Sequence, residues 1–419
     1  MTACQPIAAL NIISGRVQPG RRLFVALAGL AMAAGTVVLF EPAPYDFAFV
    51  VLLAAGVLLN RLSFTLLHRV PILLLAGYFV VNVFSTLNAQ DLPVAIKYNA
   101  VTIYLILSWL FFTGFAGQYG RPGVNALLRG FTYSGWAAAA LSSLAFFHLI
   151  PYSDLFLKSQ RAQGLFKDPN VYGPYLVAVA IFGVAALQRH RLSSLHFVFG
   201  LAASLITGIG IFLSFSRGAW INCAVSLVYM LGLQLLYGLL TRRVPAGLLY
   251  SLVALGLLAG AGGLAGSLLP RSTTQLLAVR LGNQGLQNYD RDRFDTQRRA
   301  LATVREQPMG IGPGQSEVIF DYSTHSMYVR ILTETGAFGF ITFYAFMALS
   351  FLRTTRKALT LRDDAARGIF AALSACLLGT FINGLVIDAN HWRHLWFLLG
   401  LAWWVPGTAS ELAESGGED

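Results

Sequence analysis

Long apolar stretches recur along nearly the whole chain of 419 residues, and short polar or charged clusters separate them. A helix needs about 17–25 mainly apolar residues to cross a lipid bilayer. By this criterion the pattern predicts about twelve membrane-spanning helices, of which the second and the last are short. The predicted spans are 22–41, 46–60, 70–88, 95–116, 130–150, 170–187, 196–214, 218–240, 245–268, 327–351, 368–389 and 395–407. The chain is therefore expected to be an all-α polytopic membrane protein.

The composition agrees with this class. Hydrophobic residues make up 56% of the chain and charged residues only 12%, against about 25% charged residues in an average soluble protein. The net charge of +11 fits membrane topology and an anionic lipid or substrate better than nucleic-acid binding. Cys4, Cys223 and Cys376 are far apart and form no CxxC pair, so we expect no metal, no cofactor and no disulfide framework.

The orientation in the membrane follows from the distribution of basic residues, because short basic loops stay in the cytoplasm. With the N-terminus inside, more than half of the 30 Lys and Arg residues fall in cytoplasmic loops. Both termini are then cytoplasmic, and the long loop at 269–326 is periplasmic or extracellular. We expect one transmembrane domain over 1–419 without a cleavable signal, ending in a disordered acidic tail at 408–419.

Some charges on the outer side are not explained by topology. The segment RAQGLFKDPNVYG contains Arg161, Lys167 and Asp168 around an Asp-Pro-Asn turn, and such irregular backbone should be buried in protein or line a watery cavity. Arg217 lies in LSFSRGAW between two apolar spans. A charge in that position indicates a functional site, although its side chain could also extend to the outer headgroups.

The long outer loop contains DRDRFDTQRRALATVREQPMGIGPG at 290–314. The spacing of Phe294, Leu301 and Val304 predicts an amphipathic helix between Asp290 and Glu306, which Pro308 ends. This helix could lie on the membrane surface and turn its basic residues, Arg298, Arg299 and Arg305, toward phospholipid. The glycine-rich run at 310–314 lacks the Lys and Ser/Thr of a P-loop, so it predicts a turn rather than a phosphate cradle.

Further polar residues border the last spans. The segment THSMYVRILTETGAFG places His325 at the start of the tenth span. Arg330 follows, and its i, i+4 spacing from Glu334 predicts mutual neutralisation on one helix face. Lys97, at the outer end of the fourth span, could contact phosphate or only extend to the headgroups. Asp388, near the last hairpin, could pair with a site arginine or serve as an alternative base.

The ordered set of these segments, from Arg161 to Gly339, resembles the O-antigen ligase and O-antigen polymerase superfamily, which are bacterial membrane glycosyltransferases of the GT-C type. The resemblance implies transfer of a glycan from an undecaprenyl-pyrophosphate carrier, on the periplasmic face of the inner membrane, without metal or nucleotide sugar. It also implies that Arg161 and Arg217 grip the pyrophosphate and that His325 acts near the acceptor. The superfamily usually has Asn after this histidine, whereas this chain has Ser326.

We therefore expect an inverting single displacement in which Arg161, Arg217 and His325 are the catalytic residues, since fixed arginines stabilise leaving-group charge and a histidine suits a base near neutral pH. Lipopolysaccharide ligation is favoured slightly over polymerisation. The acceptor is then the lipid A core in a ligase or another lipid-linked glycan in a polymerase. A lipid-linked glycan flippase is the alternative from a different class. The expected substrate-binding residues are Lys167, Asp168, Lys97, Arg298, Arg299, Arg330 and Asp388.

Overall fold

The structure is a computed structural model, and it describes residues 19–65, 67–187, 194–242, 246–267, 288–320 and 322–407, together with residues 269, 274, 277 and 278. These residues are mostly helical, as the sequence predicts. The longer helices are α1 (Pro19–Ala33), α2 (Pro44–Leu58), α3 (Arg69–Ser85), α4 (Leu92–Phe146), α5 (Pro169–Leu187), α6 (Leu195–Leu213), α7 (Arg217–Thr241), α8 (Ala246–Ser267), α10 (Asn288–Glu306), α12 (Met327–Thr360) and α13 (Asp364–Asn383). The shorter elements are η2 (Ala34–Thr36), η3 (Thr86–Asn88), η4 (Ser153–Phe156), β1 (Leu157–Lys158), β2 (Arg161–Ala162), α11 (Ser316–Phe320) and α14 (Arg393–Leu401).

Seven helices among the described residues are long and apolar enough to cross a membrane, namely α3 with η3, α4, α5, α6, α7, α12 and α13. This supports the predicted membrane class but does not confirm a count of about twelve spans. Helices α1 and α2 have 15 residues each and α14 has nine, which is less than a straight span needs. Helix α4 has 55 residues and covers the spans predicted at 95–116 and 130–150, which form two helical segments joined by a kink where the Gly120 backbone (φ 55°) is not helical and Pro122 follows.

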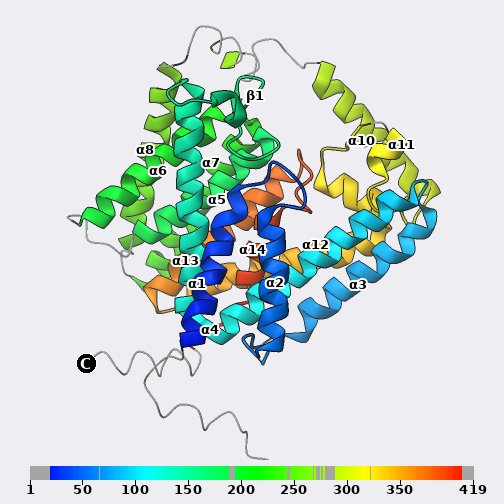
Figure 1. Cartoon of the computed structure of the whole chain (residues 1–419), viewed down its shortest axis with the longest axis horizontal. Coiled ribbons are helices and arrows are strands. Elements are labelled where there is room, and N and C mark those ends of the chain that lie inside the picture. Colours follow the sequence, from blue (N-terminus) through cyan, green and yellow to red (C-terminus); the bar gives the residue numbers. More distant parts are fainter. Residues whose placement is uncertain are drawn as a thin grey trace, which may run out of the picture.

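Helices α5 and α13 form the centre of the bundle, since 83% and 72% of their most apolar windows are buried within the protein. Helix α13 packs against α7 and α5, α6 packs against α5 and α4, and α12 packs against α3 (Figure 1). Small residues permit these close approaches. A side chain at Gly379 of α13 would come within 2.0 Å of Asn222, and one at Gly173 of α5 would come within 2.7 Å of Ala219.

Polar residues from loops gather at two opposite ends of the bundle. At the lower end in Figure 1, where α1 begins, Arg121 pairs with Asp363 at 3.1 Å and Arg21 approaches the backbone oxygen of Gln118 at 3.5 Å. The β1–β2 hairpin and α10 lie at the upper end. The distribution of basic residues predicts that the two groups lie on opposite sides of the membrane.

The glycine-rich run forms the predicted turn and docks onto a bend in α12. The bend is at Gly336 (φ 65°), where a side chain would lie 2.2 Å from the Pro308 oxygen. Gly310 (φ 88°) is equally constrained, since a Cβ added there would lie 2.3 Å from the backbone oxygen of Glu334. The Ile311 N–H donates to the backbone of α12 at 3.0 Å. This contact fixes the first part of α12, which begins two residues after His325.

Helix α10 is present as predicted. Phe294 and Leu301 are 46% and 44% exposed, whereas Ala300 is fully buried. The Ala300 oxygen accepts a hydrogen bond from Thr333 of α12 at 3.4 Å. Helix α10 therefore packs on the α12 backbone through small and polar residues, and these two large apolar side chains remain exposed.

Candidate functional site

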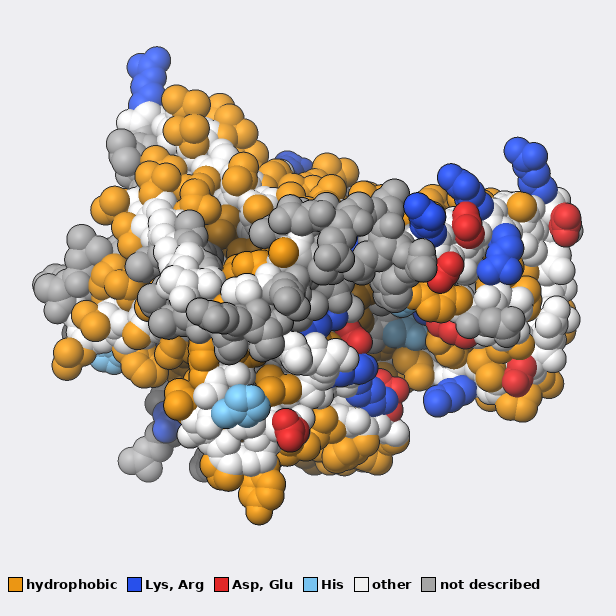
Figure 2. Space-filling model, turned by 90° about the horizontal axis from the view of Figure 1, so that it is seen from above, with side chains coloured by type: hydrophobic (Ala, Val, Ile, Leu, Met, Phe, Trp, Pro, Cys, Tyr) orange, Lys and Arg blue, Asp and Glu red, His pale blue; other side chains and the backbone are white. Residues whose placement is uncertain are grey.

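A cavity of about 670 Å³ lies at the upper end of the molecule, where the β1–β2 hairpin, the start of α7 and α10 meet. Arg161, Asp168, Arg217 and His325 all line this cavity, although they are up to 164 positions apart (325 − 161). Figure 2 looks onto this end, where Lys and Arg side chains gather around and beside a hollow and hydrophobic side chains cover much of the remaining surface. The cavity therefore brings together four of the residues that were predicted from the sequence to form one site.

Arg161 is held rigidly by the β1–β2 hairpin. The two turn residues, Ser159 and Gln160, have φ values of 50° and 58°, as a two-residue hairpin loop requires. The Arg161 side chain is 92% buried (8% exposed). Its Nε donates to the Ser214 oxygen and its Nη2 to Asn170 Oδ1, both at 2.8 Å. These bonds fix the guanidinium at the cavity wall before any ligand arrives.

The Asp-Pro-Asn turn is the start of α5. Asp168 Oδ1 accepts the Asn170 N–H at 2.7 Å, and Pro169 occupies the first helical position, where its missing N–H costs nothing. Asp168 also pairs with Lys158 at 3.4 Å, and both line the cavity. Lys167 does not line it, because its ammonium turns away to Glu41 at 3.2 Å.

Arg217 is the first residue of α7, and the sequence produces this helix start directly. Ser216 is the N-cap, and its side chain accepts from the Ala219 N–H at 3.4 Å. Ser216, Arg217 and Gly218 line the cavity, as do the first residues of α5. Two helix N-termini therefore border the same space, and each favours an anion through its free N–H groups and its dipole.

The charge of the cavity wall is strongly positive. Among the residues that the structure describes, Lys158, Arg161, Arg217 and Arg293 line it together with a single carboxylate, that of Asp168. Arginine presents several N–H donors in a planar fork that matches phosphate oxygens. The wall is therefore chemically suited to a phosphate or pyrophosphate group.

His325 is presented by a strained turn immediately before α12. It has a φ of 45°, and its ring packs edge-on against Tyr322 with the centroids 5.1 Å apart. Its backbone oxygen accepts a hydrogen bond from Arg293 of α10 at 3.1 Å. Ser326, the next residue, caps α12 by accepting from Val329 N–H at 3.4 Å. Burial lowers the pKa of the His325 imidazole below its usual 6.5, partly opposed by the Asp388 carboxylate, so the ring is a neutral proton acceptor at pH 7.

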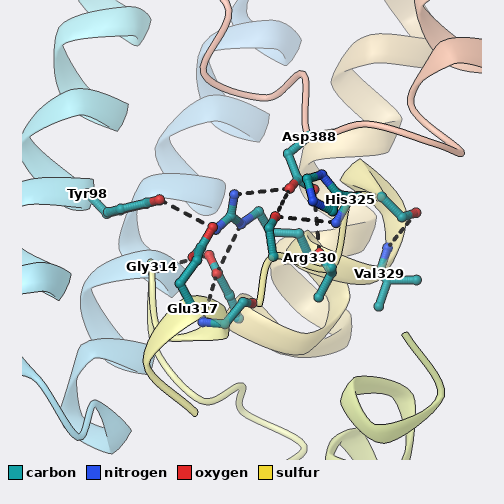
Figure 3. Close-up of polar contacts among 12 residues, drawn as sticks. Tyr98, Gly314, Glu317, His325, Val329, Arg330 and Asp388 are labelled. Carbon is teal, nitrogen blue, oxygen red and sulfur yellow. Dashed lines mark hydrogen bonds and ion pairs between the residues drawn. The ribbon is translucent and has the colours of Figure 1, made fainter. Parts of the chain in front are cut away.

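Asp388 contacts the turn that precedes His325 (Figure 3). Its carboxylate accepts hydrogen bonds from Ser323 Oγ and, at 3.4 Å, from Thr324 Oγ1. Ser323 Oγ in turn accepts from the backbone N–H of His325 at 3.3 Å. Asp388 does not line the cavity, so among the described contacts it acts on the shape of the turn.

Arg330 lies at the centre of a buried charge cluster (Figure 3). It pairs with Glu334 at 3.1 Å, as the i, i+4 spacing predicts, with Asp388 at 3.3 Å and with Glu317. Tyr98 accepts a further hydrogen bond from it at 3.4 Å. The Arg330 side chain is only 7% exposed and does not line the cavity. The cluster therefore joins α12, α11 and the Asp388 loop.

Glu334 explains why the glycine-rich run is not a phosphate cradle. Its carboxylate accepts the backbone N–H of Gly314 at 2.9 Å and that of Ser316 at 3.3 Å. The N–H groups that would face a phosphate are thus used by a side chain of the protein itself.

Three further predicted binding residues lie away from the cavity. Lys97 is exposed on α4. Arg298 and Arg299 are exposed on α10, where Arg298 pairs with Asp295 at 3.6 Å and Arg299 approaches Thr296 at 3.5 Å. None of the three lines the cavity. Arg298 and Arg299 lie on the exposed side of α10, and Lys97 lies on a different helix, α4.

Arg293, Phe294 and Asn383 also line the cavity, and none of them was predicted to do so. Arg293 lies three and seven positions before the buried Thr296 and Ala300 and shares their side of α10, but only the structure shows that this side faces the bundle. No sequence signal distinguished Asn383, which ends the apolar helix α13. Within the described parts of the chain, no group of three or more His, Cys, Asp or Glu residues is placed to hold a metal ion.

Comparison with known proteins agrees with this geometry. Residues 202–344 match the family described as O-antigen ligase, and this match supports membership of the O-antigen ligase superfamily. The matched segment is about a third of the chain and includes Arg217, Arg293 and His325, but not Arg161. A search of curated proteins finds no match. The family supports an O-antigen ligase or related polymerase activity in the membrane, on lipid-linked glycans.

Proposed function

We propose that this chain transfers a glycan from an undecaprenyl-pyrophosphate carrier to a hydroxyl group of the lipid A core, as an O-antigen ligase of the GT-C type. The observation that carries the proposal is that Arg161, Arg217 and His325 share one cavity in a chain whose segment 202–344 matches this family.

The leaving group determines what the site must stabilise. When the acceptor oxygen attacks the anomeric carbon, the bond from that carbon to the pyrophosphate oxygen breaks and the pyrophosphate carries the released electron pair. Arg161, already oriented by Ser214 and Asn170, and Arg217 at the α7 N-terminus would hold this charge. Preorganised donors of this kind stabilise the transition state more than the ground state. The cationic side chains supply the charge neutralisation that a metal provides in other transferases, so we propose a metal-independent reaction.

The acceptor hydroxyl must lose its proton as it attacks. His325 is the proposed base, because burial holds its pKa below 6.5 and leaves the imidazole neutral. A single displacement by a hydroxyl on the face opposite the pyrophosphate inverts the anomeric configuration. Asp388 is a proposed positioning residue, since its contacts hold the turn that carries His325.

The proposed location is the bacterial inner membrane, with both termini in the cytoplasm and the cavity facing the periplasm. Two observations support this orientation. The cavity lies at the end of the bundle opposite Arg21, Arg121 and Asp363, and the loops carrying these residues are rich in the basic residues that stay in the cytoplasm.

The test is reconstitution of the purified protein with an undecaprenyl-pyrophosphate glycan and, separately, with lipid A core or a second lipid-linked glycan as acceptor. Mass spectrometry identifies the elongated acceptor, and NMR of the product gives the anomeric configuration. Elongation of the lipid A core supports the ligase, and elongation of the lipid-linked glycan indicates the related polymerase. Movement of the lipid across the bilayer without a new glycosidic bond would refute both.

A further inference from the structure

Asn383 is a polar residue in the cavity wall with no assigned role. It is the last residue of α13 and is only 2% exposed, yet it lines the cavity together with Arg217 and His325. Its Nδ2 atom is buried and has no hydrogen-bond partner among the described residues. A buried amide N–H without a partner destabilises the folded chain, so native structures rarely keep one without a ligand or a function.

The position of the other amide atom fixes the direction of the side chain. A Cβ built on Gly218 would lie 2.4 Å from Asn383 Oδ1. The oxygen therefore lies against the first turn of α7, where the partial positive charge of the helix favours it. Gly218 is what permits this approach, because any side chain there would collide with the amide.

Asn383 lies between the start of α7, which carries Arg217, and the start of α12, which follows His325. The residue after it, Gly384, accepts the Met327 N–H at 2.8 Å, which ties the end of α13 to the start of α12 next to His325. On its other side lies the α7 N-terminus with Arg217. Asn383 is thus between the proposed anion-binding residues and the proposed base.

We infer that Asn383 is a further substrate-binding residue, whose Nδ2 group donates a hydrogen bond to a phosphate oxygen of the donor lipid. This inference rests on the proposed function. Phosphate oxygens only accept hydrogen bonds and Nδ2 only donates, and the same wall carries three arginines and two helix N-termini that attract an anion. Asn383 completes this wall on the side of α13.

The Asn383→Asp variant separates binding from packing. Asp keeps the shape and the oxygen that contacts Gly218, but it replaces the donor with an acceptor that repels phosphate. The probe is glycan-free undecaprenyl pyrophosphate, and the readout is the lipid-induced rise in unfolding temperature of the purified protein, titrated to an apparent Kd. Asn383→Ala should weaken binding about tenfold to a hundredfold, as expected for one hydrogen bond to a charged group, and Asn383→Asp at least as much. In transfer assays the KM for the donor should rise while that for the acceptor stays constant.

Asn222→Ala is the matched control. Asn222 is an amide of similar burial, 3% exposed, in the same α7–α13 interface, but it bonds to Ser226 and does not line the cavity. This variant should lose stability and keep the response to the lipid. Asn383→Ser, which retains a smaller donor, replaces the Ala variant if that variant does not accumulate.

The outcomes distinguish the inference from the proposed function. If the Asn383 variants bind the lipid as the wild type does while Arg217→Ala does not, the inference is overturned and the proposed function remains. If Arg217→Ala also binds normally, the proposed function fails and the inference fails with it. If Asn222→Ala weakens binding as much as Asn383→Ala, Asn383 acts through packing and the inference is again overturned.

Discussion

Replacing Arg330 with Met tests whether the buried charge cluster stabilises the end of the bundle that carries the cavity. The wild-type guanidinium balances three carboxylates, and two of them are nearly inaccessible: the Glu334 and Asp388 side chains are 5% and 11% exposed. Met has a similar length and fills much of the same volume, so the packing loss is small. The main effect is two buried carboxylates without a counter-charge, which costs about 3–5 kcal/mol when one partner of a buried pair is removed. Glu317, 41% exposed, adds little because water screens it.

The assay is unfolding of the purified protein in detergent, compared with Arg298→Met as a control. Arg298 is 82% exposed and its partner Asp295 66%, so that control should change stability by at most about 0.5 kcal/mol. Adding Glu334→Gln to Arg330→Met should recover part of the loss, because it removes one of the stranded charges. A loss below about 1 kcal/mol for Arg330→Met would show that the carboxylates are compensated in another way, and it would refute this reasoning.

Three further predictions concern the reaction and the fold. Arg217→Ala should lower kcat for glycan transfer about 10²–10³-fold, as loss of one preorganised charge donor does, while the protein level in the membrane stays normal. Arg217→Lys should retain part of the rate. Intact transfer by the Ala variant would contradict the proposed role. Burial holds the pKa of His325 below 6.5, so the rate of transfer should stay constant as the pH falls toward 6.5 and decline only at lower pH, where protonation removes the base. A pH–rate profile of the wild type and of His325→Gln checks this. The variant should be slow, and its rate should not show the decline at low pH. Gly336→Ala should destabilise the protein by about 1–3 kcal/mol in thermal unfolding, because φ there is 65° and the new Cβ would meet the Pro308 oxygen at 2.2 Å; an unchanged unfolding temperature would mean that α12 can straighten.

The sequence predicted the class of fold well because the bilayer imposes a strong and local pattern. It predicted fewer features that depend on how helices continue or meet. The spans predicted at 95–116 and 130–150 are joined as α4 across a kink at Gly120, whose backbone is not helical. Hydropathy records where apolar residues lie but not how the backbone between two such segments bends.

The site was predictable where a charge conflicts with its apolar surroundings. Arg161, Arg217 and His325 were predicted from outer charges that topology does not explain and from the family resemblance, and the structure brings all three to one cavity. The choice between neighbouring arginines was not predictable. Arg293 lines the cavity and Arg298 does not, because the rotation of α10 is set by contacts with α12 that lie far away in the sequence.

Lys167 and Asn383 show the same limit in opposite directions. Lys167 is next to a cavity residue in sequence, yet its charge is taken up by Glu41, a partner more than a hundred positions away. Asn383 gave no signal, since a single amide at the end of an apolar helix is ordinary. Only the approach of α13 to Gly218 of α7 gives it a possible role.

The N-cap at Ser326 bears on a position where this chain differs from the superfamily that it resembles. Ser and Asn are nearly equivalent as N-caps, and replacing either with Ala costs about 0.5–2 kcal/mol of helix stability. Since Ser326 accepts the Val329 N–H at the start of α12, an exchange of Asn for Ser leaves the first turn of the helix intact. The position of His325 relative to α12 is therefore the same with either residue after it.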